Sequence, residues 1–202
     1  MSNDVTVDQS ADVRAGAALG SGTVVWGGAA VREGAKVGSD CVIGRGAYID
    51  AGVTLGDRVK VQNLALIYAP AVVEDDAFIG PAVILTNDVY PRSVGPDHRL
   101  KRAGDWQADA VIVRTGASIG ARAVVIAGVS VGCYALVGAG AVVTRDVSDF
   151  ALVIGVPARQ TGWVGHAGVR LVARPDQEWA CPETSRVYRQ VDARTLVESQ
   201  RD

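Results

Sequence analysis

An aliphatic residue recurs at every sixth position through most of this chain, a period that neither an amphipathic helix nor an ordinary long strand has. Thirteen such residues run from Val13 to Leu85, and six more run from Val113 to Val143. Four residues after each comes a small or β-branched residue, usually preceded by Gly or Asp. Because Gly and Asp tolerate positive φ, this pattern predicts short strands joined by tight corners. The period is typical of a β-helix, whose stacked coils share one core.

The repeat is interrupted once. It stops after Leu85 and returns at Val113, and this interval is not a whole number of hexads. An inserted loop breaks the register in this way, and long loops in compact domains are more often functional than merely tolerated insertions. We therefore divide the chain into a polar leader (1–12), a β-helix domain (13–162) with an excursion loop (91–112), and a small C-terminal appendage (163–202).

Composition argues against several kinds of partner. A net charge of −2 without blocks of like charge is unlike a nucleic-acid-binding surface. Three cysteines without close pairing suit a reducing cytoplasm, and residues 1–12 lack the apolar segment of a secretory signal. The uncharged stretch Ala123–Thr144 is long enough to resemble a membrane span, but its hexads continue through charged sequence on both sides. We expect a buried part of the β-helix there and no membrane contact.

The hexads resemble the left-handed parallel β-helix of the hexapeptide-repeat acyltransferases, in which three hexads form one coil. The resemblance covers nearly all of residues 13–162. It implies an all-β fold in which nineteen hexads make about six coils. It also implies a homotrimer with active sites between subunits.

A second motif points to coenzyme A. After Gly138–Val147, the segment Gly155-Val156-Pro157-Ala158-Arg159 resembles the turn that closes the β-helix in coenzyme A-dependent members, where its backbone and basic residue lie along the coenzyme. A guanidinium group suits a phosphate partner. The resemblance implies acetyl-CoA as co-substrate, with backbone amides around the middle coils polarising the thioester. The expected coenzyme contacts are Gly116, Ala127, Gly128, Arg145, Gly155, Pro157, Ala158 and Arg159. Arg145 is also open to interpretation as a solvated corner charge.

The interruption itself carries the acceptor motif. Gly80–Ser93 and Val61–Pro81 resemble stretches of enzymes that acetylate the 3-amino group of nucleotide-linked 3-amino-3-deoxyhexoses. The resemblance places Asn87 beside the acceptor amine, where its carboxamide oxygen can accept a hydrogen bond. Asp88 either contacts the amine or occupies a corner of the repeat.

Three more residues are expected near the acceptor: Gln62, Asn63 and Arg92. Arg92 is expected either to meet a phosphate or carboxylate of the acceptor or to anchor the loop. Asn63 lies four hexads before Asn87, so with three hexads per coil the two occupy adjacent faces, and a shared ligand requires a neighbouring subunit.

The histidines favour an amine acceptor over a hydroxyl. Neither His98 nor His166 lies on a coil, whereas many hexapeptide acyltransferases use a coil histidine as base, and the related zinc-dependent carbonic anhydrases need three histidine ligands. A hydroxyl must lose a proton to attack a thioester, but a neutral amine is already a nucleophile. Positioning and backbone oxyanion stabilisation then suffice.

The tail resembles that of nucleotide-sugar N-acetyltransferases, in which four cysteines hold a metal. Here Gly165, Ala167 and Thr184 stand at three of those positions and only Cys181 remains. Tetrahedral zinc needs four good ligands, so we expect the tail to fold without metal.

These features predict an acetyl-CoA-dependent N-acetyltransferase of a nucleotide-linked amino sugar, cytoplasmic and trimeric. The alternatives are another acyl donor or amine acceptor on the same fold, or a non-catalytic β-helix scaffold.

Overall fold

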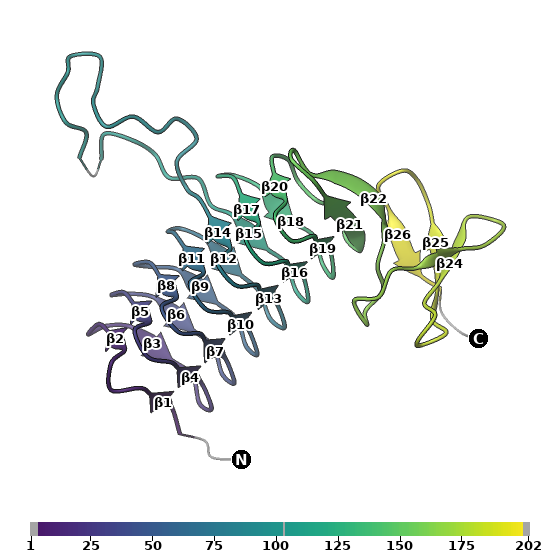
Figure 1. Cartoon of the computed structure of the whole chain (residues 1–202), viewed down its shortest axis with the longest axis horizontal. Helices are drawn as coiled ribbons and strands as arrows, with labels where there is room; N and C mark the ends of the chain where they lie inside the picture. Colours follow the sequence, from purple (N-terminus) through teal and green to yellow (C-terminus); the bar gives the residue numbers. More distant parts are fainter. Residues whose placement is uncertain (1–3, 103, 200–202) are drawn as a thin grey trace.

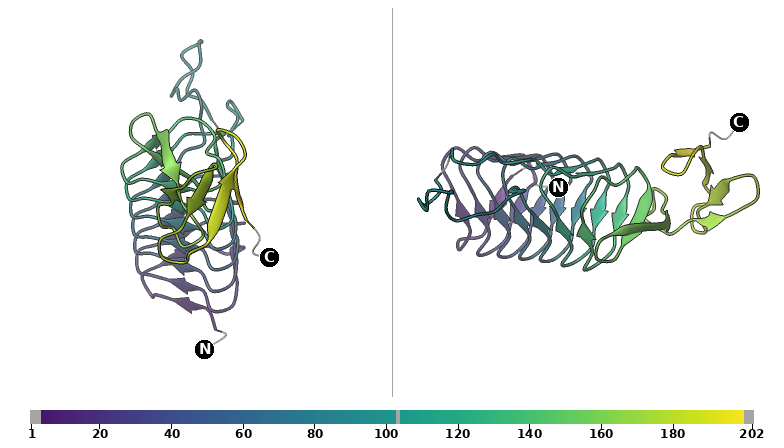
Figure 2. Two further views of the ribbon diagram at one scale, coloured as in Figure 1. Left: turned by 90° about the vertical axis from the view of Figure 1, so that its right-hand side faces the viewer. Right: turned by 90° about the horizontal axis from the view of Figure 1, so that it is seen from above.

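The computed structural model describes residues 4–102 and 104–199 as strands and turns wound into a triangular, left-handed β-helix. Its coils stack along one axis, an excursion projects from one edge near β14 (Ile84–Leu85), and a small sheet lies beyond the last coil (Figure 1). Seen from above, the coils form a regular stack with the C-terminal sheet at its end (Figure 2). The described residues contain no helix long and apolar enough to cross a membrane.

Three parallel sheets form the sides of the triangle. The first contains β1 (Thr6–Val7), β4 (Val24–Val25), β7 (Val42–Ile43), β10 (Lys60–Val61), β13 (Phe78–Ile79), β16 (Ser118–Ile119), β19 (Leu136–Val137) and β21 (Ala151–Ile154), and ends with the antiparallel β22 (Arg159–Trp163). The second contains β2 (Asp12–Val13), β5 (Ala30–Val31), β8 (Tyr48–Ile49), β11 (Leu66–Ile67), β14, β17 (Val124–Val125) and β20 (Val142–Val143). The third contains β3 (Ala18–Leu19), β6 (Lys36–Val37), β9 (Thr54–Leu55), β12 (Val72–Val73), β15 (Ile112–Val113) and β18 (Ser130–Val131).

The hexads account for this architecture. The nineteen predicted hexads correspond to the nineteen strands β2 to β20, each with its aliphatic residue as the inward second residue. Val31, Ile49, Ile67 and Leu85 are fully buried, and the small residues four positions after the first three, Ala35, Val53 and Ala71, join them in one continuous core. Val89, four positions after Leu85, is exposed instead, because the chain leaves the β-helix there. Paired strands within the repeat lie three hexads apart in sequence, as in Val72↔Thr54, which confirms that three hexads make one coil.

The Gly and Asp residues predicted at the corners all have positive φ except Asp88 and Asp146, and five corners hold other residue types at positive φ: Arg58, Leu64, Ala82, Arg122 and Tyr134. Gly16 and Asp40, for example, have φ of 87° and 55°, the left-handed region that the corner requires. Asp88 and Asp146 occupy equivalent positions in the repeat, but neither has positive φ. Asp88 therefore does not serve as a left-handed corner residue.

The start of the β-helix and the end of the excursion differ slightly from the predicted boundaries. Thr6–Val7 form β1 and pair with β4, so the β-helix begins inside the segment predicted as a leader. Val7 lies six residues before Val13 and Ala11 follows it four positions later, so the hexad pattern in fact begins one unit earlier than predicted, with both residues of β1 exposed at the end of the stack. The excursion also ends earlier than predicted, because Val111 is already in the core and Ile112–Val113 form β15.

A separate antiparallel sheet forms the appendage. It contains β23 (Val172–Ala173), β24 (Glu178–Ala180), β25 (Val187–Gln190) and β26 (Leu196–Glu198). The fully buried Tyr188 links this sheet to the β-helix, since its ring packs 5.5 Å from that of Phe150. The aromatic contact joins the tail to the last coil.

Candidate active site

Three sets of turns run along the edges of the β-helix, and we name them by the sheet that each follows. The first, second and third corners follow the strands of the first, second and third sheets. The predicted site residues lie on all three: Gln62 and Asn63 on the first; Asn87, Asp88, Ala127, Gly128 and Arg145 on the second; and Gly116 on the third.

On the second corner, Asn87 lies in line with two of the predicted coenzyme contacts. The register Leu85↔Val125↔Val143 places Asn87, Ala127 and Arg145 at equivalent positions of three successive coils. Neighbouring strands are about 4.8 Å apart, so Arg145 lies roughly 10 Å along the edge from Asn87. An extended ligand along this edge can reach both residues.

The carboxamide of Asn87 is held by the coil beneath it. Its Nδ2 donates a hydrogen bond to the carbonyl oxygen of Ala69 at 2.6 Å. This contact orients the half-buried side chain and leaves Oδ1 without a hydrogen-bond partner within the described part of the chain. The free oxygen can accept a hydrogen bond from an amine, which is the role that the sequence predicts for it.

A ladder of side chains supports the Ala69 peptide from below. Asp50 accepts hydrogen bonds from the Ala69 N–H at 3.2 Å and from the Tyr48 hydroxyl at 2.9 Å, and Arg32 donates to that hydroxyl at 3.1 Å. Burial raises the pKa of Tyr48, so its hydroxyl stays protonated at neutral pH. The ladder fixes the support on which the Asn87 amide rests.

Asp88 faces a pocket at the base of the excursion. Its Oδ1 accepts a hydrogen bond from the Tyr90 N–H at 2.8 Å. The pocket has a volume of about 410 Å³ and is lined by Asp88, Val89, Tyr90, Lys101, Asp105, Trp106, Gln107 and Asp109. Three carboxylates against one lysine make it a suitable place for an amine.

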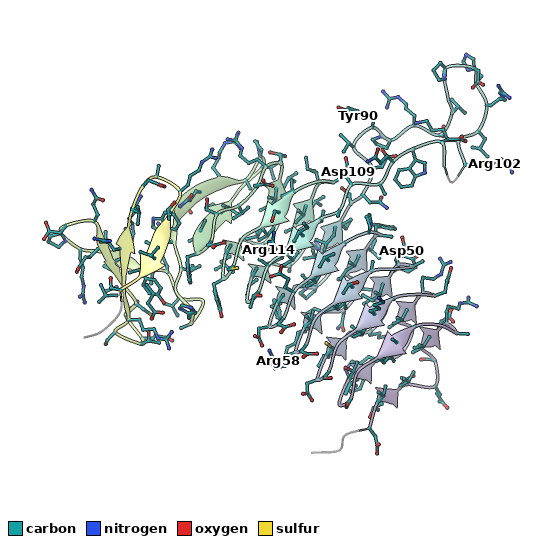
Figure 3. The ribbon with its side chains drawn as sticks, turned by 180° about the vertical axis from the view of Figure 1, so that it is seen from behind. Asp50, Arg58, Tyr90, Arg102, Asp109 and Arg114 are labelled. Carbon is teal, nitrogen blue, oxygen red and sulfur yellow. The ribbon has the colours of Figure 1, made fainter. Side chains whose placement is uncertain are left out.

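Asp109 is a residue that the motifs did not reveal. Its backbone N–H donates to the carbonyl oxygen of Asn87 at 2.9 Å, so the end of the excursion closes directly onto Asn87. Figure 3 shows Asp109 where the excursion rejoins the β-helix, with Tyr90 near it and Arg102 farther out. No hydrogen bond or ion pair joins the Asp109 carboxylate to another described residue. Only the closure of the loop brings it to the site.

The other predicted acceptor residues lie away from Asn87. Arg92 is exposed on the excursion, and its Nη1 donates to the carbonyl oxygen of Pro91 at 3.0 Å. Asn63 Oδ1 accepts from the Arg45 N–H at 2.9 Å, as Asp57 accepts from the Ser39 N–H on the third corner. The Asn63 oxygen thus has a structural role in the stack, while its amide nitrogen has no hydrogen-bond partner within the described residues.

The predicted coenzyme turn forms a basic pocket at the end of the β-helix. The Gly155 carbonyl accepts from the Val142 N–H at 3.1 Å, and the Ala158 N–H donates to the Val142 carbonyl at 2.8 Å, so the turn around Pro157 docks on β20. A pocket of about 210 Å³ brings Arg145 and Ala158 together with Arg159.

A third guanidinium lines the same pocket. Arg194 comes from the connection between β25 and β26 in the appendage, and no motif had indicated it. Arg145, Arg159 and Arg194 are all exposed there, with Asp146 as the one acidic residue among the described lining residues. A phosphate group fits both the charge and the size of this pocket.

Gly116 is not brought together with the other predicted coenzyme contacts. It lies on the third corner, where a Cβ would collide with the ring of Tyr134, in a pocket that also includes His166. His166 packs 4.3 Å from Tyr134 and meets the Tyr188 hydroxyl at 3.0 Å through Nδ1. Gly116 therefore has a packing role against this aromatic cluster.

No group of three or more His, Cys, Asp or Glu side chains in residues 4–102 and 104–199 has the arrangement of a metal site. In the appendage, Cys181 is buried, and its hydrogen bond with Thr184 lowers the pKa of its thiol. The space next to Gly165 is filled by Tyr188, whose hydroxyl would lie 2.8 Å from a Cβ there.

The chain is similar to known hexapeptide-repeat proteins. A family model described as the hexapeptide repeat of succinyl-transferase matches residues 34–67 and 111–145. A dTDP-3-amino-3,6-dideoxy-alpha-D-galactopyranose 3-N-acetyltransferase from Aneurinibacillus thermoaerophilus is 47% identical over 53 residues, which cover 26% of this chain and 28% of the relative.

Solved structures agree on the fold. A GDP-perosamine N-acetyltransferase variant from Caulobacter crescentus, in complex with CoA and GDP-perosamine, has a TM-score of 0.51 at 27% identity, covering 80% of this chain and 58% of that one. A UDP-N-acetylglucosamine acyltransferase from Bacteroides fragilis has a TM-score of 0.64 at 14% identity, covering 79% and 61%. The chain thus spans less than two thirds of the length of these relatives. The predicted hexapeptide repeat and left-handed β-helix, and with them the resemblance to the hexapeptide-repeat acyltransferases, are confirmed.

Proposed function

We propose that this protein is an acetyl-CoA-dependent N-acetyltransferase that acts on the amino group of a nucleotide-linked amino sugar, with a 3-amino-3-deoxyhexose as the favoured acceptor. The observation that carries this proposal is the second corner, where the free carboxamide oxygen of Asn87 lies in line with the basic pocket at Arg145. The names of the relatives support it, since one is a 3-N-acetyltransferase of a dTDP-amino sugar and another is in complex with CoA and a GDP-amino sugar.

The chemistry requires little beyond positioning. The neutral amine donates a hydrogen bond to Asn87 Oδ1, attacks the thioester carbonyl and forms the C–N bond, while backbone N–H groups near Ala127 and Gly128 stabilise the oxyanion. The C–S bond then breaks, and the amine proton leaves with the CoA thiol. The carboxylates of Asp88 and Asp109 favour the approach of the amine electrostatically.

The acceptor site needs a second subunit. Six residues separate one corner from the next, roughly 20 Å at the rise of an extended strand, so Asn63 and Asn87 of one chain do not meet on the same sugar. The second sheet lies between these two corners and has an apolar outer face formed by Ala30, Tyr48, Leu66, Ile84, Val124 and Val142. Packing through this sheet in a three-fold trimer brings the first corner of one subunit to the second corner of the next.

We infer a cytoplasmic location from the same chemistry. Acetyl-CoA and nucleotide-linked sugars are made there, and three free cysteines suit a reducing compartment. The reaction as written needs no metal, and the partners are the sugar nucleotide, coenzyme A and two further copies of the chain. Neither a membrane nor nucleic acid takes part.

Incubating the protein with acetyl-CoA and a panel of amino-sugar nucleotides should give one product heavier by an acetyl group, detected by mass spectrometry. The panel pairs each 3-amino sugar with its 4-amino isomer on dTDP, UDP and GDP. We expect the 3-amino substrates to be preferred, because the relative that is 47% identical over 53 residues is a 3-N-acetyltransferase. Absence of any acetylated product, together with absence of thermal stabilisation by coenzyme A, would exclude the proposal.

Changing Arg194 to alanine should raise the KM for acetyl-CoA about tenfold and leave the KM for the sugar nucleotide unchanged, because the lost group is one exposed, charge-assisted phosphate contact of about 1.5 kcal/mol. Steady-state kinetics with each substrate varied in turn would measure this. Arg174→Ala, on the same small sheet but outside the basic pocket, is the matched control. An unchanged KM for acetyl-CoA in the Arg194 variant would place the coenzyme elsewhere.

A further inference from the structure

A groove lies on the first corner, apart from Asn87 and the basic pocket on the second corner. Its volume is about 660 Å³, and it is lined by Asp8, Ser10, Trp26, Gly27, Gly28, Arg45 and Asn63. These residues follow β1, β4, β7 and β10, so the groove runs along the edge of the first coils. From Trp26 to Asn63 it extends over two coil spacings, about 10 Å.

Trp26 presents an exposed aromatic surface in this groove. The side chain is 54% exposed on the first corner, directly after β4. Two residues farther on, a Cβ at Gly28 would meet no atom within 4 Å, so this part of the groove is open. An exposed indole face is suited to stacking a nucleobase, and such stacking does not depend on which base is bound.

Arg45 provides a free cation one coil farther along. Its side chain is exposed, and its guanidinium takes part in no ion pair or hydrogen bond with another described residue. Several other arginines, such as Arg58 and Arg114, are paired with carboxylates. A free planar guanidinium matches the oxygens of a diphosphate.

Asp8 and Asn63 provide polar groups at either side of Arg45. Asp8 Oδ1 accepts from the Ser10 N–H at 2.8 Å and from its hydroxyl at 2.7 Å. These hydrogen bonds lower the pKa of Asp8, so the carboxylate is ionised at neutral pH and its second oxygen can accept a ribose hydroxyl. The Asn63 amide nitrogen can donate to a phosphate oxygen.

We propose that this groove binds the nucleoside diphosphate part of the sugar nucleotide. The base stacks on Trp26, a ribose hydroxyl donates to Asp8, and the diphosphate is held by Arg45 and the Asn63 amide nitrogen. The inference rests on the proposed function and assigns the part of the acceptor that is remote from the reacting amine. In the trimer, the sugar extends from this groove to Asn87 of the neighbouring subunit.

Isothermal titration calorimetry without acetyl-CoA tests the groove directly. We expect dTDP, UDP and GDP to bind the wild-type protein, and Trp26→Ala to weaken each at least tenfold while Trp26→Phe retains most of the affinity. Arg45→Ala should also weaken them tenfold. Arg58→Ala, an arginine on the third corner outside the groove, is the matched control and should bind like wild type.

Binding of thymidine and binding of pyrophosphate test the two halves of the groove separately. Trp26→Ala should lose binding of thymidine but not of pyrophosphate, and Arg45→Ala should do the reverse. Nucleoside diphosphate affinities unchanged in both variants, or no binding by the wild type, would overturn the assignment of the groove. Because coenzyme A binding and acetyl transfer are measured separately, either result leaves the test of the proposed function intact.

Discussion

Replacing Asn87 with alanine should lower kcat about 100-fold, because the variant no longer orients the amine against the thioester and misplacement by an ångström has that effect. The KM for acetyl-CoA should stay unchanged, since Asn87 is about 10 Å from Arg145 along the edge. Steady-state kinetics at saturating acetyl-CoA would measure the loss. The expected effect is large because the Asn87 Nδ2 is already committed to Ala69, so its oxygen is fixed toward the acceptor before substrate binds.

The control for this variant is Thr86→Ala. Thr86 is the adjacent residue on the same corner, and its hydroxyl donates a long hydrogen bond of 3.3 Å to the Val125 carbonyl. That variant should keep kcat close to wild type, and both variants should remain trimers by light scattering. Full turnover by a trimeric Asn87→Ala protein would remove Asn87 from the reaction.

Most of the fold could be predicted because each hexad specifies its own strand. Each of the nineteen aliphatic positions lies in one of the strands β2 to β20, since every hexad of a β-helix contributes to the same core. The length of the excursion also follows from the register. Val72 pairs on one side with Thr54, which lies three hexads before it, and on the other with Ile112, which lies almost seven hexads after it. The difference between these two sequence intervals equals the length of the segment 91–112. Strand β1 was not predicted although Val7 continues the hexad pattern six residues before Val13, because a single hexad within an otherwise polar segment is a weak signal.

The site was predicted less completely, because it is assembled by contacts that have no period. Gly116 and Gly128 are two hexads apart and therefore lie on different corners, while Asn87, Ala127 and Arg145 share one corner only once the excursion is removed from the count. Asp109 and Arg194 reach the site through the closure of a loop and the docking of the appendage. A sequence motif gives no information on either of these two contacts.

The shared site predicts that two nearly inactive variants regain activity when they assemble together. One carries Asn87→Ala and has an intact groove; the other carries Trp26→Ala and Arg45→Ala and has an intact Asn87. If each site uses Asn87 of one subunit and the groove of the next, every trimer that contains both variants has one intact site among its three. Co-expression of the two variants with different affinity tags, followed by tandem purification, would isolate the mixed trimers for assay at low sugar-nucleotide concentration.

The size of the recovery distinguishes a shared site from a site within one chain. Mixed trimers should show roughly a third of wild-type kcat/KM, whereas the two variants mixed after separate purification, without subunit exchange, should stay at the background of each. A site built within a single chain gives that same background in both experiments, because no chain in either mixture carries an intact Asn87 and an intact groove together. Mixed trimers that remain at background would therefore contradict the shared site, and with it the path of the sugar nucleotide from the first corner of one subunit to the second corner of the next.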